Sequence, residues 1–82
     1  MQQAHNCTPK LIDARGMSCP MPLLKAKQAL GKVEVGGKVC LLATDPGSVK
    51  DIKRFIELSA HELVEFRQVD DHYMFVLLKG VA

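Results

Sequence analysis

The chain has 82 residues, of which 48% are hydrophobic and 24% are charged, and its formal net charge is +2 at neutral pH. This length leaves room for one domain and excludes an enzyme with separate substrate and cofactor domains. The apolar content excludes a disordered chain, and the small net charge excludes a strongly basic nucleic-acid-binding domain.

The first predicted elements are a tail, a strand and a helix. Residues 1–9 are polar and aperiodic, which predicts a flexible tail before a single domain over residues 10–82. Residues 10–13 are a short strand candidate. A loop containing Gly16 follows, and residues 20–31 repeat apolar side chains at helical spacing, with Gly31 expected to end the helix.

The middle of the chain predicts a second strand and a second helix. Residues 39–43 are apolar on both faces, which is typical of a central strand. Ser48 with Asp51 three residues later is a weak capping-box pattern for the start of the next helix. Its inner face is expected to lie in the core, away from any docking partner, and consists of Ile52, Phe55 and Ile56.

Two further strands complete the chain. Residues 62–69 alternate imperfectly, which predicts an edge strand, and residues 73–78 are apolar on both faces, which again predicts a central strand. Asp70 to His72 can turn the chain because Asp tolerates left-handed conformations. The order βαβαββ predicts a fold of the α/β class, more specifically an α+β sandwich in which one sheet and one layer of helices form two layers. Both helices are expected on one face, each joining parallel neighbouring strands by a right-handed path.

One constellation points to chemistry: Cys19 followed by Pro20 and Pro22 at the predicted helix start. We expect Cys19 to be the N-cap, where the helix dipole and free N–H groups stabilise an anion and lower the pKa of the thiol. The two prolines leave Met21 and Leu23 as the N–H donors of the first turn.

The surrounding charges fit an anionic sulfur. Residues 20–33 contain no acidic side chain, and residues 1–41 carry a net charge of +4 against −2 for the remainder. Arg15, Lys25 and Lys27 are therefore candidates for anion stabilisation and for steering a partner. The alternative is that Cys19 merely caps a helix, because many free cysteines act only as small hydrophobic residues.

The other cysteines and the histidines carry weaker signals. Cys40 lies mid-strand and is expected to be structural, whereas Cys7 lies in the tail, where a sulfur-relay role and adventitious oxidation both stay open. No histidine has metal-ligand spacing to a cysteine, so neither a metal nor a cofactor is expected. His61 is expected to cap or pack a helix-to-strand junction, although a pairing with Cys19 in space stays open.

Location follows from composition and cysteine use. No apolar run approaches the roughly 18 residues of a membrane span, and the start lacks the pattern of a signal peptide. Three cysteines are an odd number and too few for a disulfide scaffold. We therefore expect a cytosolic protein with reduced thiols and no membrane partner.

Residues 11–27, LIDARGMSCPMPLLKAK, closely resemble the signature of the TusA/SirA family of small sulfur-carrier proteins. Residues 44–52, TDPGSVKDI, resemble the second block of that family, and the chain has Ala60 where the family usually has Gly before His-Glu. The resemblance extends over residues 10–79. It implies a four-stranded mixed sheet in the order 1-2-4-3, with two helices on one face.

The resemblance also implies a function. The family cysteine, matched by Cys19, accepts a sulfane sulfur from a cysteine desulfurase or similar donor and carries it as a persulfide. An acceptor protein then receives the sulfur, for tRNA 2-thiouridine synthesis or in a sulfur-oxidation relay. Such a protein is a sulfurtransferase acting on other proteins rather than on a small molecule. Donor docking is expected around the start of the first helix, at Arg15, Met17, Met21, Lys25 and Lys27.

Three other functions are weighed against a monomeric sulfur carrier. A thioredoxin-type redox protein needs a resolving thiol at position 22, which is Pro22. The hypothesis of a regulatory or nucleic-acid-binding module rests on fold analogy alone. Direct strong nucleic-acid binding is not expected of this protein. Such a module would keep its activity in Cys19→Ser, which abolishes sulfur transfer. A structural interaction domain would be indifferent to alkylation of Cys19.

Overall fold

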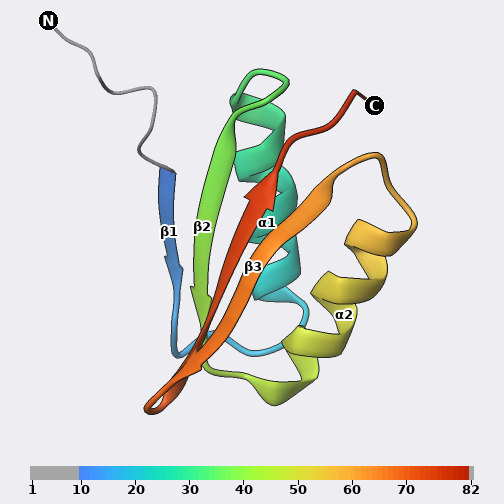
Figure 1. The fold of residues 1–82 in the computed structure, drawn as a ribbon. Helices are drawn as coiled ribbons and strands as arrows, with labels where there is room; N and C mark the ends of the chain where they lie inside the picture. Colours follow the sequence, from blue (N-terminus) through green and yellow to red (C-terminus); the bar gives the residue numbers. More distant parts are fainter. Residues whose placement is uncertain (1–9, 82) are drawn as a thin grey trace, which may run out of the picture.

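The computed structural model describes residues 10–81, which form one sheet covered on one face by two helices (Figure 1). The elements in chain order are β1 (Lys10–Ala14), α1 (Met21–Lys32), β2 (Lys38–Ala43), α2 (Pro46–Glu57), β3 (Glu62–Val69) and β4 (His72–Leu78). This confirms the predicted βαβαββ order and the two-layer sandwich.

The sheet is mixed and has the strand order β1-β2-β4-β3. β1 runs parallel to β2, while β4 is antiparallel to both β2 and β3. The central places of β2 and β4 confirm what their apolar pattern predicts. One expectation about the connections is wrong: α1 joins neighbouring parallel strands, but α2 joins β2 to β3 with β4 between them.

The strand directions bring both helix starts to one end of the sheet. β1 and β2 end in register at Ala14 and Ala43, so the loops that lead into α1 and α2 leave the sheet side by side (Figure 1). The opposite end holds the start of β1 and the end of β4, where Leu78 pairs with Lys38. The same end as the helix starts carries the β3–β4 turn, where Asp70 has a φ of 51°, as predicted for this turn.

The core fills the space between the sheet and the helices. Val39 and Leu41 of β2 alternate into it, as do Phe75 and Leu77 of β4. The helices contribute Ala26, Ala29, Leu30, Ile52 and Ile56. Such alternation on strands and three-to-four spacing on helices is why this sequence folds into two layers.

The helix ends differ from the sequence-based expectation in three places. α1 passes through Gly31 to Lys32, because Gly31 faces solvent and the chain becomes extended only at Val33. Pro20, not Cys19, occupies the N-cap of α1, after a cis Cys19–Pro20 peptide bond. Asp45, not Ser48, caps α2, where its Oδ1 accepts from the Gly47 N–H at 3.3 Å.

No helix within the described residues, 10–81, has the length and apolar character that crossing a membrane requires.

Candidate functional site

Cys19 lies exposed in the loop between β1 and α1, one residue before the helix N-cap. The Met21 N–H, expected to be free for the sulfur, instead donates to the Ser18 carbonyl at 2.9 Å. The Leu24 N–H donates to the Pro20 carbonyl at 3.1 Å and opens the helical ladder. The sulfur therefore does not receive the first-turn donor that an N-cap position was expected to supply.

The thiol is instead held by α2. The Cys19 Sγ donates to the Asp51 Oδ2 at 2.9 Å, and the Cys19 N–H donates to the Asp45 Oδ2 at 2.8 Å. Asp51 lies in the second turn of α2, whereas Asp45 is its cap. Two carboxylates from an element that follows in sequence thus flank the cysteine.

This arrangement reverses the expected electrostatics. The hydrogen bond to the Asp51 carboxylate, together with partial desolvation and the charges of Asp51 and Asp45, raises the pKa of the Cys19 thiol. A carboxylate that accepts the thiol proton favours the neutral form, because an adjacent thiolate would repel it. The expectation of a lowered thiol pKa, which counted Arg15 and the residues of α1 but not the carboxylates of the α2 start, is therefore wrong.

The loop around Cys19 is fastened to the β2–α2 loop by further contacts. The Gly16 N–H donates to the Thr44 Oγ1 at 2.9 Å, and Gly16 has a φ of +81°, which favours glycine. The Asp45 carboxylate also accepts from the Ser48 Oγ at 3.3 Å. The two segments that resemble family blocks thus form one local structure.

The predicted cations do not converge on the sulfur. The Arg15 guanidinium forms a two-pronged pair with Asp13, from Nε to Oδ1 and from Nη2 to Oδ2, both at 2.9 Å. This pairing lowers the pKa of Asp13 to about 2. The Arg15 side chain is thus paired with Asp13 of the preceding strand, which argues against its expected role in stabilising an anion at Cys19.

Lys25 and Lys27 lie on different sides of α1, because residues two apart on a helix point in nearly opposite directions. Lys25 lines a hollow beside β1 with Lys10 and Asp13. The Lys27 Nζ lies 5.2 Å from the centroid of the Phe55 ring on α2. The two lysines therefore do not form one steering patch.

The predicted docking methionines also differ from each other. Met17 is half-buried and packs against the core. Met21 is 41% exposed at the start of α1, two residues after Cys19. Of the two, Met21 is the one available to a partner.

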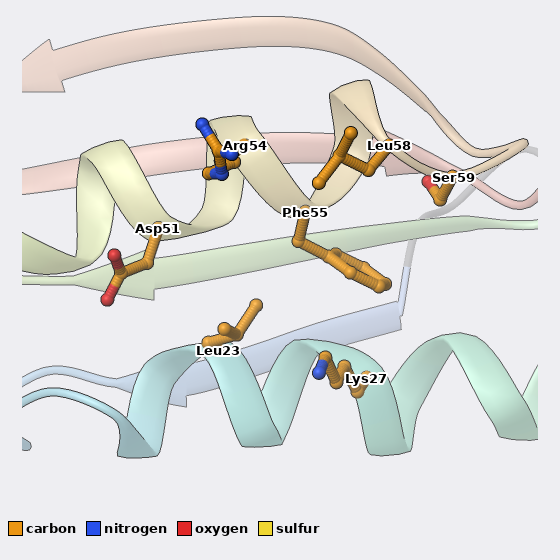
Figure 2. Close-up of a pocket in the computed structure, with 7 residues that line it drawn as sticks. All are labelled: Leu23, Lys27, Asp51, Arg54, Phe55, Leu58 and Ser59. Carbon is orange, nitrogen blue, oxygen red and sulfur yellow. The ribbon is translucent and has the colours of Figure 1, made fainter.

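An open groove of about 340 Å³ lies between α1 and α2. Figure 2 shows Asp51 at the end of this groove near the start of α1, with Leu23 and Phe55 facing each other across it. The full lining is Leu23, Lys27, Asp51, Arg54, Phe55, Leu58 and Ser59. Phe55 was expected to be core only, but it is half-buried and forms a groove wall.

The remaining candidates lie elsewhere. Cys40 is partly buried in β2, and burial raises the pKa of its thiol, which fits the expected structural role. His61 lies between α2 and β3, beside the paired Glu62 and Leu78 at the end of the sheet away from the helix starts, and its Nδ1 accepts from the Gly80 N–H at 3.0 Å. It therefore packs a junction, as expected, and does not pair with Cys19. Cys7 and the predicted tail lie outside the described residues.

Sequence reasoning missed Asp45 and Asp51 as site residues. Asp51 was assigned to a capping box, and Asp45 only to a chain break. The available signal was the block at residues 44–52, which resembles the family at a fixed distance from Cys19. The structure explains why this second block accompanies the cysteine motif, because Asp45 and Asp51 contact Cys19 directly.

Comparison with known proteins identifies relatives over most of the chain. The family model described as sulfurtransferase TusA matches residues 10–79. The sulfur carrier protein TusA of Allochromatium vinosum is 38% identical over 69 residues, covering 84% of this chain and 91% of that protein. A putative sulfur carrier protein of Archaeoglobus fulgidus is 41% identical over 69 residues, covering 84% and 94% respectively.

The fold is also known from a solved structure. The crystal structure of a SirA-like protein from Desulfitobacterium hafniense superposes with a TM-score of 0.76 and 29% sequence identity, covering 87% of this chain and 97% of that one. The family match over residues 10–79 contains Cys19 and both carboxylates. The chain therefore belongs to the TusA family, whose relatives above are named sulfur carrier proteins.

Proposed function

We propose that this protein is a sulfur carrier that holds a sulfane sulfur as a persulfide on Cys19. The observation that carries the proposal is the exposed Cys19 just before α1, whose thiol donates to Asp51 and whose N–H donates to Asp45, both in the second block. The names of the relatives support the carrier role. Pro20 and Pro22 support it as part of the motif, since Pro20 is the N-cap of α1 and Pro22 is buried in its first turn.

The donor is a persulfide on another protein, such as a cysteine desulfurase. The Cys19 sulfur attacks the terminal sulfur of the donor, the donor S–S bond breaks, and the donor cysteine departs as a thiol. An acceptor cysteine then removes the sulfur by the same step in reverse. The downstream route is tRNA 2-thiouridine synthesis or a sulfur-oxidation relay. The chemistry requires a reduced thiol, which the cytosol maintains.

Partner docking uses the start of α1 and the adjoining groove between the helices. Exposed apolar side chains are present at both places: Met21 is 41% exposed and Leu58 is 75% exposed. Lys27 adds a cation at the groove wall, where it can attract an acidic partner surface. A shallow apolar surface with a charged rim is typical of transient protein–protein contacts.

The test is sulfur loading by a cysteine desulfurase supplied with ³⁵S-labelled cysteine. We expect one labelled sulfur on the native protein and none on Cys19→Ala. Cys40→Ser is the matched control, because it removes the other described thiol and should leave loading unchanged. Label that remains on Cys19→Ala would move the chemistry to another cysteine and contradict the proposal.

A further inference from the structure

The Asp51 carboxylate contacts the Cys19 sulfur, and the contacts within residues 10–81 give it no other hydrogen-bond or ion-pair partner. It lies in the second turn of α2, after the cap that Asp45 provides. Among the described residues, the Cys19 thiol is the one side chain that donates a hydrogen bond to this carboxylate, with Sγ and Oδ2 2.9 Å apart. No described cation lies within ion-pair distance of it. Asp51 is thus available to exchange a proton with Cys19.

The other charged groups near Cys19 have different partners. The Asp45 Oδ2 accepts from the Cys19 N–H and the Ser48 Oγ, and its Oδ1 accepts from the Gly47 N–H. Arg15, the cation of the β1–α1 loop, is paired with Asp13. The first turn of α1 contains no acidic residue. Asp51 is therefore the base in direct contact with the sulfur.

We infer that Asp51 is the proton acceptor of sulfur transfer, which keeps Cys19 a neutral thiol at rest and takes its proton as the sulfur attacks a donor persulfide. The inference rests on the proposed carrier function and adds a residue to it. The raised pKa of the Cys19 thiol agrees with the resting half of this role. The hydrogen bond from Sγ to Oδ2 provides the route by which the proton passes from Cys19 to Asp51 during the attack.

The step balances in atoms, protons and electrons. The Cys19 Sγ forms a bond to the terminal sulfur of R–S–SH while its proton moves to the Asp51 Oδ2. The donor S–S bond breaks, its electron pair stays on the donor sulfur, and that sulfur receives the proton from Asp51. Cys19 is oxidised from thiol to persulfide, and the donor is reduced from persulfide to thiol.

A carboxylate is a weak base toward a resting thiol, but the attacking sulfur becomes strongly acidic. As Sγ forms a bond to the second sulfur, its S–H bond weakens. The Asp51 carboxylate, 2.9 Å away, then accepts the proton, so that no free thiolate has to form first. The consequence is selective reactivity. The neutral thiol reacts slowly with diffusing oxidants and alkylating agents, because the thiolate is the nucleophile for these reagents.

The test measures two rates on the same proteins, wild type and Asp51→Asn. The first is alkylation of Cys19 by iodoacetamide, followed by peptide mass spectrometry over a pH series. The second is sulfur uptake at Cys19 from glutathione persulfide. The amide keeps the shape of the side chain and removes its negative charge. Glu57→Gln, an exposed carboxylate later on α2, is the matched control.

The two rates are expected to change in opposite directions in Asp51→Asn. Each unit by which the thiol pKa falls gives about ten times more thiolate at neutral pH and about threefold lower nucleophilicity, so alkylation speeds up about threefold per unit. Sulfur uptake should fall by on the order of 100-fold, the low end of general acid–base effects. Glu57→Gln should change neither rate.

Other outcomes overturn the inference. Uptake that stays constant or rises together with alkylation would mean that the thiolate fraction alone limits transfer. An unchanged alkylation profile would mean that Asp51 does not hold the thiol proton. Absence of sulfur on wild-type Cys19 would instead overturn the proposed carrier function, so the two failures are distinguishable.

Discussion

At the scale of the residue, Cys19 shows that the environment of a thiol is decided by its neighbours in space. The rule that a cysteine at a helix start is acidic counts the helix dipole and the free N–H groups of that helix. Here the Met21 N–H is already used by Ser18, and Asp51 of a different helix contacts the sulfur. The hydrogen bond to the Asp51 carboxylate, 2.9 Å from the sulfur, favours the neutral thiol and raises its pKa.

Arg15 provides a prediction at this scale. Its pairing with Asp13 holds the pKa of that carboxyl at about 2, so Arg15→Ala should raise the Asp13 pKa toward the ordinary value of about 3.9. A carboxyl whose pKa is lowered by folding adds stability above its unfolded pKa and loses that stability as the pH falls through its folded pKa. The wild type should therefore lose this small contribution between about pH 4 and about pH 2.

The measurement is an NMR titration of the Asp13 carboxyl carbon in wild type and Arg15→Ala. The alkylation rate of Cys19, measured on the same samples, should not change, because Arg15 is engaged by Asp13. A slower alkylation in Arg15→Ala would restore Arg15 as a stabiliser of the sulfur anion.

At the scale of the element, the start of α2 organises the start of α1. Asp45 caps its own helix through Gly47 and also accepts from the Cys19 N–H of the neighbouring loop. Pro46 follows at the first helical position, where a missing N–H costs nothing. The sequence could predict a helix here within a few residues. It could not predict that the cap of one helix holds the cysteine of the other.

Two substitutions of Asp45 test whether its capping hydrogen bonds or its charge stabilise the fold. Asp45→Ala should lower the free energy of unfolding by about 1 kcal/mol, since Ala is a poor N-cap. Asp45→Asn should retain most of that stability, because Asn is a good cap and its side-chain oxygen can still accept from the Cys19 N–H. Urea unfolding followed by circular dichroism measures both variants. Equal loss in Ala and Asn would show that charge, not capping, is what Asp45 contributes.

At the scale of the whole molecule, the spacing of apolar residues along the sequence predicted most of the fold. The element types, the central places of β2 and β4 and the buried stripes of both helices follow from residues such as Leu41, Phe75 and Ile52. The site was predictable at Cys19, because a cysteine with two prolines at a helix start is a local pattern. The acids, the separation of Lys25 from Lys27 and the groove wall at Phe55 arise from packing between elements, which no local pattern encodes.

The separation of the two lysines gives a prediction for docking. Lys27→Glu should slow sulfur uptake from a cysteine desulfurase roughly tenfold at low salt, the low end of electrostatic steering effects, and should weaken the salt dependence. Lys25→Glu makes the same change in net charge on the β1 side of the helix and should have a smaller effect. Initial rates of labelled-sulfur transfer at low and high salt provide the comparison, with circular dichroism as the control for folding.

An equal loss in both variants would mean that net charge alone governs association. Unchanged rates in both would place the docking surface away from α1, most simply on the open face of the sheet.

The strand directions have a practical consequence for how this carrier can be used. Cys19 follows the end of β1 in the loop that leads into α1, whereas β1 begins and β4 finishes at the other end of the sheet (Figure 1). A tether attached at Lys10, where β1 begins, or at Gly80, just after β4, therefore joins the molecule at the end of the sheet away from the loop that carries Cys19. The fold can be joined to a larger chain, a bead or a fluorescent label through either connection while the cysteine stays free to reach its partners.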